Sequence, residues 1–582
     1  MHKIVNPQQT RLFDPFDGVL TEITRKHLLV GWPGVFRHVI LELMPVDTMA
    51  GHFDPALGRP TKELYSMAGL LLIMEFKNWT KQEALDAYRF HLDIHYALNL
   101  EPVAHDISIR TLERYINYFE EDDLAKMIMS DVTVKLVDLL GIKIDKQRLD
   151  STHIFSDMAS FGRTRMMGVT IKRFLTRVKR RNPEDYHTLS EPLQHRYVSS
   201  VHQLFGDVGK DKESRRLLRQ QVAENMYYLV RHFAELPEYA GINTYKIMER
   251  IFYEQCQVHE DKVSVKAKTG GKVTQNPSDP EATYDGHKGP GYQAQIAETC
   301  NPENEAQLIT CAIPQTAIEP DANAVEAVLH DLQTNNLTPD SMLVDTSYAG
   351  DENVRFAQAQ GVELVGPVPS GSSKTKTDEY ERLNVDDFDI DEQSEEVVCC
   401  PAGHKSQSSE HNHQTGKTKT VMPASACRQC EWFEQCPVKK IKGQYQLEHT
   451  AKQRRLAGRR REQDTEVFRE RYKTRGGIEG TNSGLKRKTG LGQLRVRGRP
   501  AVFQAIYLKI AGWNILRASV CAKMRQIVYA RANMAVFWLN FVFLRMTIAS
   551  ESVRMDAKRR FLWLCREFEK LTKLSIAAQA NF

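Results

Sequence analysis

The chain has no apolar run long enough to cross a bilayer. Stretches such as MAGLLLIMEF, at residues 67–76, fall well short of the roughly 20 residues that a membrane-spanning helix needs. The opening residues, MHKIVNPQQT, also lack the apolar segment that follows the basic start of a secretory signal. We therefore expect a cytoplasmic protein with no membrane contact.

Cysteine is scarce as well, with ten residues in a chain of 582. In a long intracellular protein, scattered cysteines are more plausibly thiols or metal ligands than a disulfide framework. Hydrophobic residues make up 41% of the chain and charged residues 26%, which is ordinary for a globular protein. The composition therefore favours a folded protein that does not depend on disulfides.

Net charge is also low overall, at +5, but it is concentrated in one block. Residues 451–499 hold sixteen Lys and Arg against five Asp and Glu, so this block carries +11 and the rest of the chain −6. Such blocks are usually disordered tails, but this one is internal and contains aromatic and aliphatic residues. We interpret it as a docking surface for phosphates.

A chain of 582 residues exceeds what a single hydrophobic core usually organises, so we expect several modules. The expected parts are a helical N-terminal domain (1–140), the first part of an α/β core (141–370) with a helical insert (about 161–258), an insert with an acidic linker and cysteines (371–460), the last part of the core (461–520) and a helical tail (521–582).

Helical periodicity dominates the first part. Thr80 and Glu83 form a capping-box pattern, and a later helix, HDISIRTLERYINYF, begins at Asp106 or Ser108. Short helices in this order are compatible with a helix-turn-helix that directs Arg110 and Arg114 towards DNA. They are equally compatible with a plain helical bundle.

Two aspartates follow predicted strands. The stretch GIKIDKQRLD, residues 141–150, predicts a strand that ends on Asp150, and SMLVD ends on Asp345 within a βαβ rhythm. Sites in open α/β sheets form at such strand ends. Each aspartate alone is equally compatible with a turn or a helix cap.

One charged segment carries an acid among cations. In YKTRGGIEGTNSGLK, residues 472–486, helical spacing puts Tyr472, Arg475, Glu479 and Lys486 on one face, and Arg487 and Lys488 follow. This arrangement suits a metal ligand beside a polyanion, although a solvated amphipathic helix has the same pattern. The glycines within it are poor helix formers, and we expect them to allow a close approach of DNA backbone.

Four cysteines cluster in the second insert: Cys400, Cys427, Cys430 and Cys436. The Cys427–Cys430 spacing lets two sulfurs bind one tetrahedral Zn²⁺, and Cys399 or His404 could replace one member. We predict a structural zinc site, with unliganded thiols as the alternative.

The order Asp, Asp, Glu resembles that of the DDE transposases of bacterial insertion sequences. The resemblance rests on LDST at 149–152, on LVDTSYAGDENV at 343–354, and on the spacing from Tyr472 to Lys486, which is similar to the YREK pattern of one group of these enzymes. NPSDPEATYDGHKGPGYQAQIAET also looks like the passage into the second strand of relatives. The inserts, 194 residues between the aspartates and 133 before Glu479, fit a family with interrupted catalytic domains.

This resemblance implies an RNase H-like core, a mixed five-stranded sheet with flanking helices. Asp150, Asp345 and Glu479 would be the catalytic ligands of two Mg²⁺ ions, with Mn²⁺ as a substitute, for cutting transposon ends and joining the 3′-hydroxyl to target DNA. Tyr472, Arg475 and Lys486 would grip phosphates of double-stranded DNA. A homodimer assembled on two ends, in the bacterial cytoplasm at the nucleoid, is the implied working form.

Two other functions fit the same residues. A nuclease of this fold would cut DNA without joining it. A transposase derivative that has lost activity would bind the terminal repeats as a regulator, and its sequence would lack one of the acids.

Overall fold

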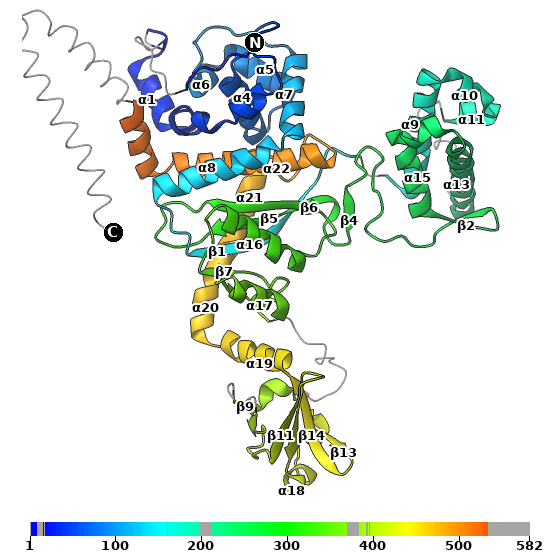
Figure 1. The fold of residues 1–582 in the computed structure, drawn as a ribbon, viewed down its shortest axis with the longest axis vertical. Coiled ribbons are helices and arrows are strands. Elements are labelled where there is room, and N and C mark those ends of the chain that lie inside the picture. Colours follow the sequence, from blue (N-terminus) through cyan, green and yellow to red (C-terminus); the bar gives the residue numbers. More distant parts are fainter. Residues whose placement is uncertain are drawn as a thin grey trace, which may run out of the picture.

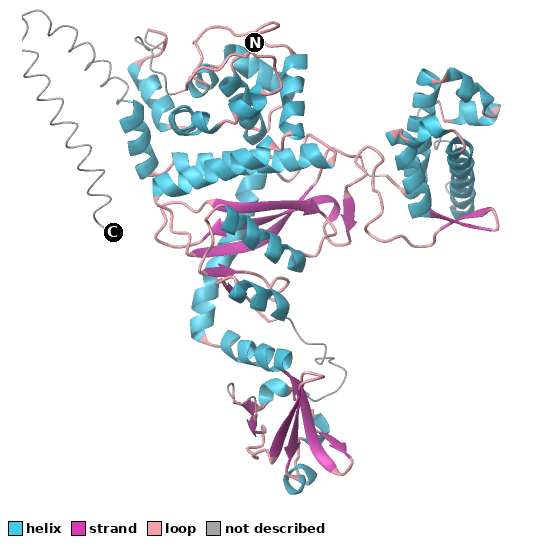
Figure 2. Ribbon diagram, in the orientation of Figure 1, coloured by secondary structure: helices cyan, strands magenta, loops and turns pink. Residues whose placement is uncertain are grey.

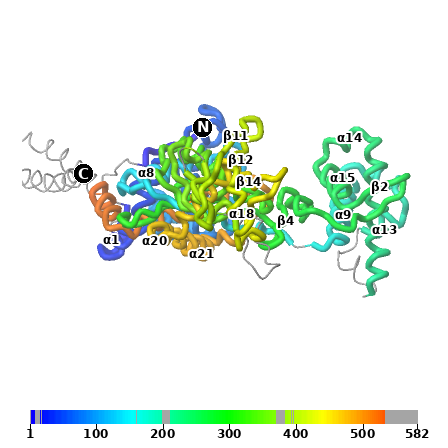
Figure 3. Tube along the Cα trace, turned by 90° about the horizontal axis from the view of Figure 1, so that it is seen from below, coloured from blue at the N-terminus to red at the C-terminus, as the bar shows by residue number. Residues whose placement is uncertain are grey.

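The structure is a computed structural model that describes residues 2–532 except 8–14, 17, 160, 198–210, 369–382, 392, 393 and 395. Helices of the N-terminal region lie against a central sheet, a helical insert projects from one side of the sheet, and a small β-rich module lies below it (Figure 1). The view turned by 90° also places the helical insert apart from the central body (Figure 3).

The central sheet is mixed and has the hydrogen-bonded order β4-β5-β1-β7-β8, with β6 on the free edge of β5. Its strands are β1 (Lys146–Ile154), β4 (Thr283–Asp285), β5 (Gly289–Thr299), β6 (Ile309–Thr316), β7 (Ser341–Leu343) and β8 (Glu363–Val365). β5 runs antiparallel to β1, β4 and β6, whereas β1, β7 and β8 are parallel. The predicted βαβ unit is therefore confirmed, and β4 adds a short strand to the five expected.

One predicted strand boundary is wrong. The strand expected to end on Asp150 instead runs from Lys146 to Ile154, so Asp150 lies in its middle. Its antiparallel partner β5 continues past this point and supplies backbone hydrogen bonds as far as the Ile154–Tyr292 pair. The parallel pairing with β7 stops at Arg148. Asp150 thus stands just beyond the end of the parallel part of the sheet, although it does not end its own strand.

Helices cover both faces of the sheet because β5 alternates its side chains between two cores. Ile296 belongs to the core that also contains α8 (Leu124–Leu140) and α22 (Arg499–Ser519), and its neighbour Ala297 belongs to the core that contains α16 (Ala324–Thr334). The connection between β7 and β8 is α17 (Asp351–Ala359). Figure 2 shows this layering of helices around the strands.

The N-terminal helices share one core with the sheet and α22. They are α1 (Glu22–Val30), α2 (Trp32–Val35), α3 (Val46–Ala50), α4 (Leu64–Phe76), α5 (Lys81–Phe90), α6 (Leu92–Ala97) and α7 (Ile109–Glu121), with a π-helix (Phe36–Ile40) and a 3₁₀ turn (Leu41–Leu43) after α2. The capping box of Thr80 and Glu83 is confirmed, and Ser108 rather than Asp106 caps α7.

The helical insert has its own core, in which aromatic side chains such as Phe174 and Phe233 are fully buried. Its elements are α9 (Arg163–Arg181), α10 (Pro183–Thr188), α11 (Glu191–Arg196), α13 (Lys212–Ala234), α14 (Pro237–Ala240), α15 (Asn243–Gln255) and the hairpin β2 (Cys256–His259) and β3 (Lys262–Val265). Asp211 caps α13, because its side chain accepts from the Ser214 N–H.

The β-rich module consists of two small sheets. β9 (Asp389–Ile390) and β10 (Val397–Cys399) form one, and β11 (Ser408–Asn412), β12 (Lys417–Met422), β13 (Lys439–Ile441) and β14 (Gln444–Thr450) form the other. Helical turns join these strands: η4 (Val385–Asp387), α18 (Ala424–Arg428) and η5 (Phe433–Gln435).

A series of helices returns from this module to the sheet (Figure 1). It comprises α19 (Ala451–Gln463), α20 (Glu466–Tyr472), the 3₁₀ turn η6 (Lys473–Gly476), α21 (Gly477–Thr489) and α22, which is buried along most of its length. Residues 522–532 are helical, and the rest of the expected tail lies outside the described residues. Within the described part of the chain, no helix combines the length and apolarity needed to span a membrane.

Candidate functional site

The three acids that the sequence singled out lie around one side chain, that of Arg475. Asp150 comes from the middle of β1, Asp345 from the turn two residues after β7, and Glu479 from the first turn of α21. Arg475 Nη2 lies 3.2 Å from Asp150 Oδ1 and 3.8 Å from Asp345 Oδ2, and Nη1 lies 3.2 Å from Glu479 Oε1. The fold therefore brings together three carboxylates that are far apart in sequence.

The environments of the three carboxylates differ. Asp150 is buried, Asp345 is partly exposed, and the Glu479 side chain is largely exposed. Burial raises the pKa of Asp150 to about 6, the Arg475 guanidinium opposes this rise, and the charges of Glu479 and Asp345 add to it. Asp345 accepts hydrogen bonds from the Ser347 backbone N–H at 2.8 Å and the Ser347 hydroxyl at 2.6 Å. One oxygen of Asp345 is thus fixed by its own turn, and the other faces Arg475.

A buried ion pair anchors the Arg475 segment to the sheet. Glu298 on β5 stands directly opposite Arg148 on β1, and its carboxylate accepts from Arg148 Nε at 2.8 Å. The same carboxylate accepts from the Thr481 hydroxyl of α21 at 2.7 Å, and Arg148 also donates to the Thr474 carbonyl at 2.7 Å. Glu298 is fully buried. These bonds hold η6 and α21 above the middle of β1.

The charged segment is helical as expected, but it is not one continuous α-helix. Tyr472 ends α20, Arg475 lies in the 3₁₀ turn η6, and α21 begins only at Gly477. Residues 473–476 form a 3₁₀ turn. Arg148 donates a hydrogen bond to the Thr474 carbonyl in this turn, and the two successive glycines 476 and 477 do not favour an α-helix. Arg475 and Glu479, four residues apart, still face each other across this turn.

Packing within the protein explains two of the glycines that we attributed to DNA. A Cβ on Gly477 would lie 2.0 Å from Arg148 Nη1, and a Cβ on Gly484 would lie 2.6 Å from the ring of Trp513. By contrast, a Cβ on Gly476 or Gly480 would meet nothing within 4 Å. Close approach of α21 to the sheet and to α22 therefore requires glycine at 477 and 484, and only 476 and 480 retain the DNA interpretation.

Tyr472 is held by the protein itself. Its hydroxyl donates to the Val344 carbonyl at 3.0 Å, one residue before Asp345, and its ring stacks on Phe468. Burial raises its pKa. In this structure the tyrosine positions the turn that carries Asp345, and phosphate contact by Tyr472 stays a prediction.

Further basic side chains lie on α21 and in the turn before β5. Lys486 is half-buried, and its pKa is lowered by burial and by the charge of Lys288, with Asp150 opposing the shift. Lys288 donates to the Ser151 hydroxyl at 3.1 Å. Arg487 and Lys488, in the last turn of α21, are exposed. The structure thus places Lys486 near Asp150, with Arg487 and Lys488 exposed on the same helix.

Arg110 and Arg114 lie elsewhere. Both are exposed on α7, and the opposite face of that helix packs Leu112, Tyr115 and Phe119 into the N-terminal core, as expected. They are not part of the acid cluster. Whether they meet DNA stays a prediction.

Sequence reasoning missed Arg148, Glu298 and Lys288. The sequence contained a signal for Arg148, because this residue and Asp150 are two positions apart on one strand and so share a face of the sheet. Glu298 is an acid at the end of a strand that is otherwise uncharged, YQAQIAET. Their pairing depends on the register between β1 and β5, which residue types alone do not reveal.

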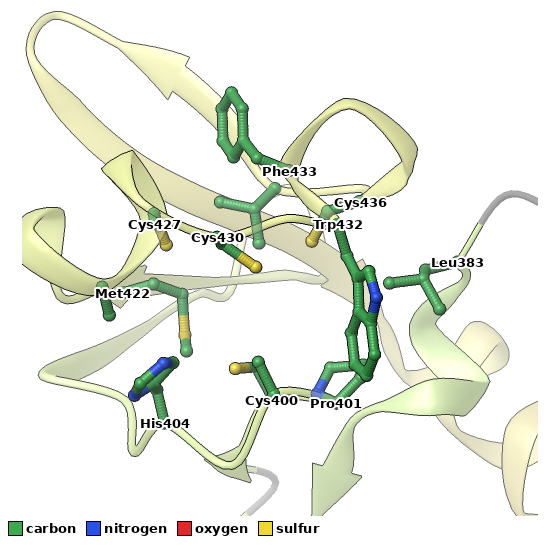
Figure 4. A pocket seen from close by; sticks show the side chains of 13 residues that line it. Leu383, Cys400, Pro401, His404, Met422, Cys427, Cys430, Trp432, Phe433 and Cys436 are labelled. Carbon is green, nitrogen blue, oxygen red and sulfur yellow. The ribbon is translucent and has the colours of Figure 1, made fainter.

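The four cysteines also come together. Cys400, Cys427, Cys430 and Cys436 line one small cavity of about 20 Å³, and their sulfur atoms point towards it (Figure 4). Burial raises the pKa of the Cys427 thiol to about 11. As the side chains stand in this structure, no group of three or more His, Cys, Asp and Glu among the described residues could hold a metal ion, either here or at the acids.

Comparison with known proteins gives one family match. Residues 399–518 match the family described as "Transposase DDE domain", a range that includes Glu479 and lies downstream of Asp150 and Asp345. No curated protein matches the chain. A solved structure described as "Cryo-EM structure of piggyBac transposase synaptic complex with hairpin DNA" matches at 12% identity over 69% of this chain and 75% of that chain, but its TM-score of 0.19 is too low to carry an argument. The family match supports a DDE transposase.

Proposed function

We propose that this protein is a transposase of the DDE type from a bacterial insertion sequence, in the group with the YREK pattern. It would bind the terminal inverted repeats, cut the DNA at the ends of the element and join the freed 3′-hydroxyl to target DNA. An RNase H-like core, a homodimer on two ends and a cytoplasmic location at the nucleoid belong to the same proposal.

The observation that carries the proposal is the shared contact of three carboxylates with one cation. Asp150, Asp345 and Glu479 come from segments far apart in sequence, yet each places an oxygen within 3.8 Å or less of the Arg475 guanidinium. A simple helix cap or turn would require none of these long-range contacts. The arrangement is what a carboxylate site for a positive charge needs.

The donor set fits Mg²⁺. Carboxylate oxygens are the ligands that this hard cation prefers, and the Arg475 guanidinium marks the point at which the three acids already accept positive charge. Asp150, Asp345 and Glu479 would hold two Mg²⁺ ions, with Mn²⁺ as a substitute. The bound ions would neutralise charge on the scissile phosphate and activate a water or a 3′-hydroxyl.

Arg475 has a second role in this proposal. Its guanidinium contacts the same carboxylate oxygens that a divalent cation would use, so the two cannot occupy the position together. We expect Arg475 to leave the acids on metal binding and to take a phosphate of the DNA instead, since its planar fork suits either carboxylate or phosphate. The side chain would thereby couple metal loading to DNA contact.

The other cations would hold the DNA. Lys486, beside Asp150, and the exposed Arg487 and Lys488 lie close enough in α21 to follow a backbone past the acids. Exposed Arg110 and Arg114 would add contacts away from the cut. Such phosphate contacts supply affinity rather than sequence recognition.

A strand-transfer assay tests the proposal. Purified protein is incubated with Mg²⁺, a target plasmid and DNA that carries the inverted repeats flanking the coding sequence, either intact or precleaved at the 3′ end. We expect cutting of the intact end and joining of the precleaved end. Cutting without joining would indicate a nuclease, and repeat-specific binding without cutting would indicate an inactive regulator; either result overturns the proposal.

A further inference from the structure

The cysteine cluster lies where the two small sheets of the β-rich module meet. Cys400 directly follows β10, Cys427 lies in α18, and Cys430 and Cys436 flank η5. Their sulfur atoms point into one cavity from these separate segments (Figure 4). A volume of about 20 Å³ exceeds the roughly 10–15 Å³ needed to hold a single water-sized particle and leaves no room for an organic ligand.

Tight turns fix the backbone at the cysteines. Cys400 accepts from the Gly403 N–H at 2.8 Å and donates to the His404 carbonyl at 2.9 Å, and Gly403 has a φ of +78°, which favours glycine. The Cys436 thiol receives a hydrogen bond from the backbone of Val438. The thiols are therefore positioned by local structure and not by chance contact of mobile side chains.

The neighbouring candidates differ from these four. The Cys399 thiol lies 3.9 Å from Asp389 Oδ2 and is absent from the cavity lining. His404 does line the cavity, so its imidazole is the one realistic substitute for a thiolate. No disulfide joins any cysteine in the described ranges, which leaves all four thiols available as ligands.

The β-rich module has a small hydrophobic core. Its core in the described residues consists of Phe388, Ile390, Val397, Met422, Val438, Tyr445 and Leu447. A two-stranded sheet such as β9–β10 is marginal in water, and small domains with few core residues are commonly stabilised by a metal. A cation at the cavity would join β10 to the segment between β12 and β13.

We propose that Cys400, Cys427, Cys430 and Cys436 bind one structural Zn²⁺ that ties the two sheets of the module together. Four thiolates complete the tetrahedral coordination of zinc, so no position stays open for catalysis. This site is independent of the acids and of DNA cleavage.

Metal analysis of the full-length protein, purified without chelator, tests the proposal. We expect about one zinc per chain, and Co²⁺ exchange should give the thiolate-to-metal and d–d absorption bands of tetrahedral cobalt. A thiol reagent should modify the four cysteines slowly until a chelator is added, whereas Cys399 should react at the same rate in both conditions. Absence of zinc, together with equal thiol reactivity before and after chelation, would overturn the site.

Single substitutions identify the ligands. Cys430→Ser and Cys400→Ser should lose zinc to a chelator concentration that leaves the wild type loaded, and Cys399→Ser, the matched neighbour, should retain it. His404→Ala should also retain it. If His404→Ala released zinc and Cys400→Ser did not, the four-thiolate set would be wrong. The thiol measurement on the unmodified protein decides the question even if a variant fails to fold.

Discussion

At the scale of single residues, Arg475 is the most informative side chain. It is only 17% exposed, and the three carboxylates around it carry up to three negative charges, with the charge of Asp150 depending on a pKa of about 6. A guanidinium in this position lowers the repulsion among the acids in the same way as a metal ion would. In the proposed two-metal site, the residue would therefore compete with a divalent cation for the same oxygens.

Arg475→Gln should bind Mn²⁺ more tightly than the wild type in the absence of DNA. Removing the competing cation needs to contribute only about 1.4 kcal/mol to give a tenfold lower Kd. Titration followed by electron paramagnetic resonance or calorimetry measures this. Lys473→Gln, which removes the same charge two residues away from an exposed pair with Glu470, is the control and should bind like the wild type. Equal or weaker Mn²⁺ binding by Arg475→Gln would rule out the competition.

Substitutions of two glycines in α21 distinguish packing within the protein from contact with DNA. Gly484→Ala should destabilise the protein by about 1–3 kcal/mol, because its Cβ would overlap the Trp513 ring. Gly480→Ala, whose Cβ has open space, should stabilise α21 by up to about 1 kcal/mol. Thermal unfolding of both variants measures the difference. If DNA backbone approaches position 480, the same Gly480→Ala variant should bind DNA more weakly despite its higher stability.

At the scale of elements, the site depends on how α21 and η6 are fixed to the sheet. The Arg148–Glu298 pair connects two strands to this segment through Thr474 and Thr481. A buried charge that loses its partner is costly, whereas a pair at the surface contributes little. The pair should therefore determine the geometry of the acids although it contacts no substrate.

Glu298→Gln should cost about 3–5 kcal/mol of stability, since it leaves Arg148 buried without a counter-charge. Glu363→Gln, which breaks the exposed pair with Arg471, is the matched control and should cost at most about 1 kcal/mol. Denaturant unfolding measures the stability of each variant, and limited proteolysis between α20 and α21 reports whether α21 stays anchored to the sheet. Similar stabilities of the two variants would mean that the buried pair does not anchor α21.

Much of the element pattern was predictable from the sequence, and the contacts between elements were not. A short apolar run predicted β7, and helical periodicity predicted α7, because each pattern depends on local burial. The end of β1 was misplaced because β5 extends the pairing beyond Asp150. The hydrogen bond from Arg148 to the Thr474 carbonyl, next to Arg475, joins positions more than 300 residues apart, and local spacing contains no such information.

At the scale of the whole molecule, the basic block of residues 451–499 forms a continuous path of helices that leads to the acids. The path runs from the β-rich module through α19 and α20 to α21 at the sheet (Figure 1). The sequence predicted the charge of this block, and the structure places one of its cations, Arg475, against Asp150 and Asp345. A polyanion bound along this path would pass the three carboxylates.

The salt dependence of DNA binding should accordingly come in part from the cations of α21. Replacing Arg487 and Lys488 by Ala should lower the slope of log K against log salt by about 1 for each phosphate that the variant no longer neutralises. Fluorescence anisotropy over a salt series measures the slope. Arg180 and Arg181, exposed at the end of α9, provide a control that removes the same charge from the helical insert. An unchanged slope for the α21 variant would place the DNA elsewhere.

The central claim is that Asp150, Asp345 and Glu479 act as one metal-dependent site. The most direct measurement is Mg²⁺-dependent cleavage of terminal-repeat DNA by Asp150→Asn, Asp345→Asn and Glu479→Gln, each checked for folding and for DNA binding. We predict that every variant binds the DNA and that none cuts it, with a loss of activity of the same order for all three. Wild-type cleavage by any one of them would contradict the three-acid site.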